Sequence, residues 1–128
     1  MPAWEEYKAH AKERGALAFE VYVAVSTPVA DPAEIMEVLP DHLAYIRSLE
    51  VSGQLMFAGP LSDETGTQMQ AMGMLVLRAA NMEEAKELAA NDPMHKAGVR
   101  SFVLRKWLIN EGQVMVSLGL SGQTAKLI

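Results

Sequence analysis

Apolar residues recur at every second position near the start of this chain. From Leu17 to Val25, large apolar side chains alternate with residues such as Glu20, and several of them are β-branched. This period of two predicts a β-strand with one buried face. Further strands are predicted at residues 54–58, 72–79, 99–107 and 114–118, the last as an extra strand or arm.

Helical spacing of apolar residues predicts three helices between and before these strands. The first covers residues 4–14 and ends near Gly15. The last begins after the cap residue Asn81, and Pro93 is expected to stop it.

The middle helix is expected to begin at Asp31 and Pro32, because an acidic cap followed by proline is typical of a helix start. Pro40 lacks a backbone N–H, so we expect a break near residue 39 and a firmer helix over residues 40–52, ended by Gly53. Apolar positions of this helix form one stripe, and His42 lies beside it. The stripe comprises Leu39, Leu43, Ile46 and Leu49.

The order strand, helix, strand, strand, helix, strand predicts an α+β fold of the split βαβ type (βαββαβ). Such a chain typically forms an antiparallel sheet with both helices on one face. The length of 128 residues fits one domain. We expect residues 17–110 to form it, with residues 1–16 as a helical extension and residues 111–128 as an extra strand or arm.

The sheet face without helices needs a cover. We expect Tyr22 on this face, together with either Phe102 and Leu104 or Val103 and Trp107 from the last strand. Exposure of such an apolar patch is unusual in a monomer, so the pattern predicts a homodimer through the sheets. The C-terminal segment is a candidate for crossing between the subunits.

Composition narrows the function classes. Half of the residues are apolar and 21% are charged, which is typical of a globular domain. No apolar run spans a bilayer and the first residues lack a signal-peptide core, so we expect no membrane partner and a cytoplasmic location. The net charge of −5, without a basic block, argues against nucleic acid as a partner.

Metal and thiol chemistry find no support in the sequence. There is no cysteine, and the three histidines show neither close metal-ligand spacing nor an H-E-x-x-H pattern, so we expect no metal and no cofactor. Nine methionines are compatible with a small-molecule pocket, although ordinary core packing is the simpler interpretation.

The candidate site combines His42, the run from Asp92 to Gly98 and the turn Gly59, Pro60 and Leu61. Imidazole titrates near neutral pH, and a carboxylate bonded to one ring nitrogen makes the other a better base. The glycine would let the backbone approach a ligand and offer an N–H to a developing oxyanion.

These residues resemble a motif set of the YCII-related family, which has a dimeric ferredoxin-like α+β barrel fold. The resemblance spans residues 17–110. It rests on His42, Tyr45, Leu49, Gly53, Leu55, Ala58, Gly59, Pro60, Leu61, Glu84, Ala85, Asp92, Pro93, Ala97, Gly98 and Trp107. The family commonly has phenylalanine where Met94 stands, and this chain has extra residues at both ends.

The resemblance implies a cofactor-independent enzyme with His42 and Asp92 as its catalytic pair. The family is related to muconolactone isomerases, and one branch is a dehydrochlorinase of a chlorinated hydroxyquinol. Proton transfer during isomerisation or elimination on a small aromatic or lactone-like metabolite is therefore expected. We assign Gly59, Pro60, Leu61 and Met94 to substrate binding.

Structural interpretations of the same residues stay open. His42 fits a hydrogen-bonded core histidine, Asp92 fits a turn residue before proline, and Gly59 with Pro60 fits an ordinary turn. His95 competes with His42 as the titrating partner, although a histidine in a loop is more often solvated. The alternative functions are a non-catalytic dimeric small-molecule-binding module and a purely structural dimer.

Overall fold

The computed structural model describes residues 1–128 and divides them into two compact units. One unit is Glu20–Trp107, which holds the candidate site. The other combines Met1–Phe19 with Leu108–Ile128. The two units are described separately below.

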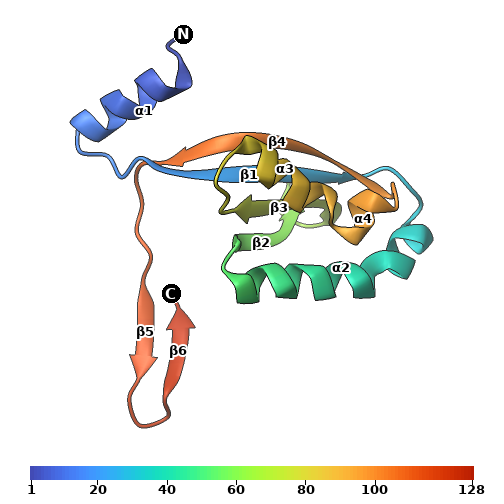
Figure 1. Cartoon of the computed structure of the whole chain (residues 1–128). Coiled ribbons are helices and arrows are strands. Elements are labelled where there is room, and N and C mark those ends of the chain that lie inside the picture. The colour runs from blue at the N-terminus through green and yellow to red at the C-terminus, as the bar shows by residue number, and fades with distance from the viewer. The chain divides into compact units, whose positions relative to one another are not determined.

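A four-stranded antiparallel sheet forms the larger unit (Figure 1). Its order is β2-β3-β1-β4, and its strands are β1 (Phe19–Pro28), β2 (Leu55–Ser62), β3 (Met69–Leu77) and β4 (Arg100–Ile109). In the central pair, Ala24 of β1 lies opposite Leu75 of β3. The four strands predicted for this sheet are therefore confirmed, as is the βαββαβ order.

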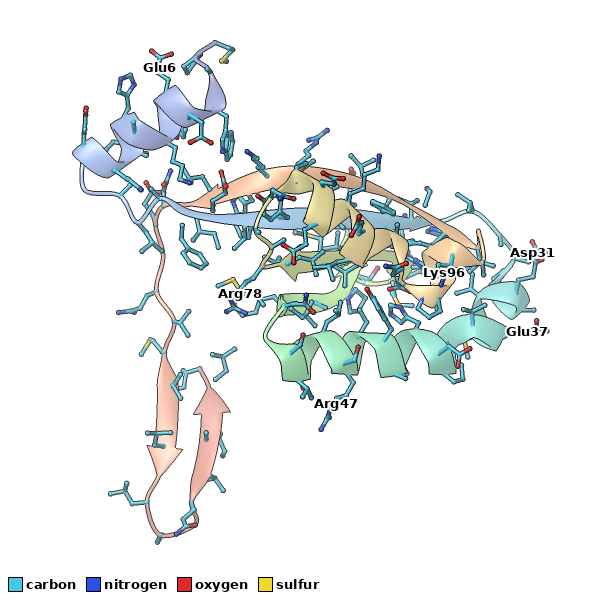
Figure 2. The ribbon with its side chains drawn as sticks, in the orientation of Figure 1. Glu6, Asp31, Glu37, Arg47, Arg78 and Lys96 are labelled. Carbon is cyan, nitrogen blue, oxygen red and sulfur yellow. The ribbon has the colours of Figure 1, made fainter.

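The helices α2 (Pro32–Ser52) and α3 (Met82–Ala90) pack on the same face of this sheet. A short further helix, α4 (Pro93–Lys96), follows α3. The core between these layers consists of Tyr22, Ala24, Leu49, Leu55, Leu75, Leu77, Ala85 and Ala89. Charged residues of α2, such as Glu37 and Arg47, point away from the sheet (Figure 2).

Tyr22 lies in the core, contrary to the prediction that it belongs to the open face. It is 2% exposed and, like Ala24, packs on the helix side. Alternation on β1 fixes which residues share a face, but both faces carry apolar residues, so the pattern does not say which face meets the helices. The open face instead carries Val103 and Trp107, which are 58% and 44% exposed.

Pro40 does not break the middle helix, so that expectation is wrong. α2 runs without interruption from Pro32 to Ser52, and Gly53 ends it with a φ of 82°. Because Pro40 has no N–H, the carbonyl of Met36 lacks its helical hydrogen-bond partner. Both residues are exposed, so water can replace the missing hydrogen bond.

Gly59 and Pro60 continue β2, whereas the sequence predicted a bend into the loop at these residues. Pro60 pairs with Gly73 of β3. Because β2 is an edge strand, a residue without an N–H is tolerated there. Pro93 likewise starts α4, where the prediction had it only as the stop of the preceding helix.

The second unit contains α1 (Trp4–Glu13), which packs Ala11 against Ala18 and Leu108. Its C-terminal part is a hairpin of β5 (Val116–Gly119) and β6 (Thr124–Leu127), where the sequence predicted one strand or arm. Apolar residues of the hairpin are exposed, Leu120 most of all at 88%. None of the helices combines the length and apolar character that spanning a membrane requires.

Replacement of Leu77 by alanine tests the core. Leu77 is 1% exposed, so we expect Leu77→Ala to lower the free energy of unfolding by about 2–5 kcal/mol, since it leaves a cavity. The matched Leu120→Ala variant removes the same atoms from an exposed position and should change it by less than about 0.5 kcal/mol. Urea denaturation of both variants measures the difference, and equal values would contradict this core.

Candidate active site

Asp92 owes its position to the proline that follows it. A residue before proline is kept out of the helical region, so the chain leaves the helical conformation at Asp92 and restarts α4 with Pro93 at its first position. The Asp92 side chain caps α4, because its Oδ1 accepts a hydrogen bond of 2.9 Å from the backbone N–H of Met94. Asp92 is only 1% exposed.

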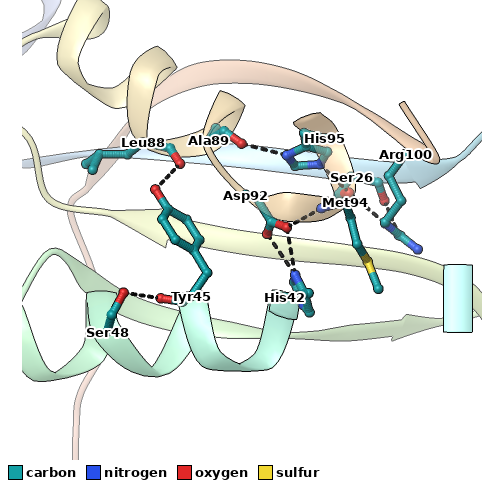
Figure 3. A network of polar contacts seen from close by, with 10 residues as sticks. All are labelled: Ser26, His42, Tyr45, Ser48, Leu88, Ala89, Asp92, Met94, His95 and Arg100. Carbon is teal, nitrogen blue, oxygen red and sulfur yellow. Dashed lines mark hydrogen bonds and ion pairs between the residues drawn. The ribbon is translucent and has the colours of Figure 1, made fainter. Parts of the chain in front are cut away.

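His42 reaches this carboxylate from α2 (Figure 3). Its Nδ1 lies 2.9 Å from Oδ1 and 2.8 Å from Oδ2 of Asp92. An ionised carboxylate only accepts hydrogen bonds, so Nδ1 is the donor, and in the neutral ring Nε2 is then the basic nitrogen. The structure therefore brings together the two side chains that the sequence assigned to catalysis.

A cavity of about 410 Å³ opens beside this pair, a volume within the range of small-molecule sites. His42, Asp92, Gly59, Pro60 and Met94 all line it. Leu61, which the sequence grouped with them, does not line it.

Most of the cavity wall is apolar. Five of the nine methionines line it: Met36, Met69, Met72, Met74 and Met94. The charged or titratable side chains in the wall are His42, Asp92 and Arg100. No cluster of three or more His, Asp or Glu side chains is arranged to bind a metal ion.

A second polar network lies at the same end of the sheet. His95 Nδ1 donates to the carbonyl of Ala89 at 2.6 Å, which makes Nε2 the acceptor of the Ser26 hydroxyl at 2.8 Å. The His95 ring also stacks at a tilt on Phe102, with centroids 4.7 Å apart. His95 is therefore held by the fold and does not compete for the Asp92 carboxylate, contrary to the expectation of a solvated loop histidine.

Arg100 completes this network, and the sequence gave no prediction for it. Its Nε donates to Ser26 Oγ at 2.8 Å and its Nη2 to Ser26 O at 3.0 Å and to Ala71 O. Burial lowers the pKa of the Arg100 guanidinium, an effect that the negative charge of Asp92 partly opposes. Ser26 is the sequence feature that could have indicated this network, because its hydroxyl lies on the same face of β1 as the buried residues Tyr22 and Ala24.

Ala71 offers its carbonyl from an irregular part of β3. Between the pairs Pro60–Gly73 and Ser62–Met69, one residue of β2 lies opposite three of β3. Ala71, in the middle of these three, has a φ of 61°, which is uncommon for a residue with a Cβ. The bulge thus turns a backbone carbonyl toward Arg100.

Tyr45 joins α2 to the segment before Asp92. Its hydroxyl donates to the carbonyl of Leu88 at 2.7 Å. Burial raises the pKa of the Tyr45 phenol, and the negative charge of Asp92 raises it further.

Comparison with known protein families gives the family of this chain. The model of the YCII-related domain family matches residues 19–108, which is most of the chain. The chain belongs to the YCII-related domain family. The matched residues include both members of the His42–Asp92 pair, together with Ser26 and Arg100.

Two known proteins illustrate the relationships of this YCII-related chain. An uncharacterized protein of Haemophilus influenzae is 33% identical over 75 residues, which cover 56% of this chain and 76% of that protein. A solved structure of 5-chloro-2-hydroxyhydroquinone dehydrochlorinase from Burkholderia phenoliruptrix, in complex with 2,5-dihydroxybenzoquinone, aligns with a TM-score of 0.49. It has 24% sequence identity, and the alignment covers 67% of this chain and 92% of that one.

The raised pKa of Tyr45 predicts a loss of stability in alkali. The unfolded phenol ionises near its ordinary value of 10.0, whereas the folded one resists ionisation. The neutral Tyr45 phenol therefore contributes fully to the free energy of unfolding below pH 10.0, and this contribution is lost as the pH rises through the pKa of the folded state. Urea denaturation from pH 8 to 11 should show a steeper alkaline decline for the wild type than for Tyr45→Phe. Tyr7→Phe, altered on α1, should keep the wild-type slope.

Proposed function

We propose that this YCII-related protein is a cofactor-free enzyme that transfers a proton on a small metabolite. His42 is the base, and Asp92 orients its ring. The observation that supports this assignment is the contact of His42 Nδ1 with both Asp92 oxygens, at 2.9 and 2.8 Å, in the wall of an open cavity. General-base catalysis needs such a held ring with one basic nitrogen near the ligand space.

In the proposed step, His42 Nε2 takes a proton from a carbon beside a carbonyl group. The electron pair of the broken C–H bond moves onto the carbonyl oxygen, which gives an enolate or, in a cyclic dienone, a phenolate. In an elimination the pair instead forms a C=C bond as a leaving group such as chloride departs from the neighbouring carbon. Asp92 stabilises the imidazolium that forms. In an isomerisation the imidazolium returns the proton at another carbon, and in an elimination it releases the proton to water.

Gly59, Pro60 and Met94 are proposed to hold the substrate, whereas Leu61 lies outside the cavity wall. A Cβ built on Gly59 would meet no protein atom within 4 Å, so the backbone there is open to a ligand. An N–H at this position would stabilise a developing oxyanion.

A non-catalytic small-molecule-binding module is the second candidate function. The methionine-rich wall favours it, because methionine adapts to irregular apolar ligands. Binding of a ligand that survives His42→Ala, with no turnover in the wild type, would favour this candidate.

The base can be tested with 5-nitrobenzisoxazole, a small neutral probe. Removal of its ring C–H proton breaks the N–O bond and leaves a coloured cyanophenolate, so no other reactant is required. We expect His42→Ala to lower kcat/KM by about 100-fold or more, the typical contribution of a general base. Asp92→Asn should lower kcat more than it changes KM, because the amide no longer fixes the basic nitrogen.

His10→Ala is the matched control, because His10 is an exposed histidine on α1. It should keep the wild-type rate. Equal rates for the wild type and His42→Ala, with both proteins folded, would reject His42 as the base.

We also propose that the open face of the sheet binds a second copy of this chain. A second hollow of about 510 Å³ lies on this face, lined by Val23, Val25, Thr27, Met74, Val103, Arg105, Lys106 and Trp107. Large exposed apolar residues in one patch are typical of a protein interface, and identical chains most often pair by a twofold axis.

Replacement of Trp107 by glutamate tests this interface. We expect the wild type to sediment with twice the chain mass, and Trp107→Glu to shift toward the monomer, because removing a carboxylate from water at the interface costs free energy. Val51→Glu places the same charge at a residue of α2 that is 76% exposed, and it should stay dimeric. A monomeric wild type at high protein concentration would contradict the proposal.

A further inference from the structure

Arg100 forms no direct ion pair with a protein carboxylate, although the negative charge of Asp92 lies near it. Its three hydrogen-bond acceptors are Ser26 Oγ, Ser26 O and Ala71 O, all of them neutral. The nearby Asp92 carboxylate is already bonded to His42 and to Met94 N–H. The guanidinium therefore bonds only neutral acceptors of the protein, and its remaining N–H groups can still form a charge-assisted hydrogen bond with an anionic ligand.

The free donors of Arg100 belong to Nη1. A guanidinium has five N–H bonds, and the contacts to Ser26 and Ala71 use the one on Nε and those on Nη2. Arg100 lines the same cavity as His42, and Figure 3 shows its side chain beside Ser26 and Met94. The two Nη1 hydrogens are thus the donors of Arg100 that no protein group accepts.

We propose that the cavity takes a small organic acid and that Arg100 Nη1 binds its carboxylate. This inference deepens the proposed function, because it names the substrate class of the same cavity. Arg100 is the one arginine or lysine in a mostly apolar wall that also holds the Asp92 carboxylate, so a monoanion fits it better than a phosphate, which would need more donors. The carboxylate lies at Arg100, the apolar body lies along the methionines, and the reacting carbon lies at His42.

The surroundings of Arg100 make it a specific anchor. Its guanidinium is tied to β1 through Ser26 and to the β3 bulge through Ala71, so little side-chain freedom is lost on binding. The apolar wall lowers the local dielectric, which strengthens a contact between opposite charges. A neutral ligand of the same shape would form a weaker hydrogen bond with Arg100 than a carboxylate does, so the cavity should discriminate against it.

Titration with benzoate and its neutral analogue benzamide tests the inference. We follow binding to the full chain by NMR and expect the wild type to prefer benzoate by tenfold or more. Arg100→Gln should weaken benzoate binding about tenfold or more, as expected for loss of a charge-assisted hydrogen bond, and leave benzamide binding unchanged. Arg100→Lys should retain part of the preference.

Arg78→Gln is the matched control. Arg78 also donates to backbone carbonyls, those of Gly53 and Leu55, but it is exposed and does not line the cavity (Figure 2). This variant should bind benzoate as the wild type does. Because Arg100→Gln could disturb the bulge, a second measurement uses the wild type: the Arg100 Nε–H resonance should shift with benzoate and not with benzamide.

Two results would overturn the inference. These are equal affinity of the wild type for benzoate and benzamide, and absence of benzoate binding at concentrations in the tens of millimolar. Both are separate from the proposed function, which is tested by the rate of His42→Ala on a neutral probe. Retained benzoate preference with no His42-dependent rate would reject the base and leave Arg100 as a ligand anchor.

Discussion

The buried Asp92 carboxylate is the constraint on which the site depends. Transfer of an isolated carboxylate out of water costs several kcal/mol of free energy. A buried carboxylate is therefore stable only where hydrogen-bond donors of the protein replace the solvent. Here Met94 N–H and His42 Nδ1 supply them. The first donor starts α4 and the second comes from α2, so this one group connects the two helices and orients the histidine ring.

Ser26 has the corresponding role on the sheet side. Its hydroxyl lies between His95 Nε2 and Arg100 Nε, and its carbonyl accepts from Arg100 as well. One buried hydroxyl therefore joins β1, β4 and the segment around α4. The Asp92 and Ser26 networks border the same cavity. They hold its charged and polar side chains in fixed positions, while the rest of its wall is apolar.

The errors of sequence interpretation have physical causes outside the local pattern. Alternation on β1 is real, yet it cannot say which face the helices cover, and Tyr22 was therefore assigned to the wrong one. The sequence predicts breaks at Pro40 and Pro60, because proline lacks an N–H. An exposed helix side and an edge strand both tolerate that loss, and these settings exist only in the folded chain.

The sequence by itself determined the order of the four strands of the sheet and of the two helices that cover it, because periods of two and of 3.6 are local properties of the chain. It did not predict α4 or the second strand of the C-terminal hairpin. It also pointed to His42 and Asp92, through a helix face and an acid before proline. Only the tertiary structure decided that these residues, 50 positions apart, share a hydrogen bond. Only the tertiary structure likewise showed that Arg100 donates a hydrogen bond to Ser26, 74 positions away. Such partners depend on strand register and on a bulge in β3, which arise when distant segments pack together.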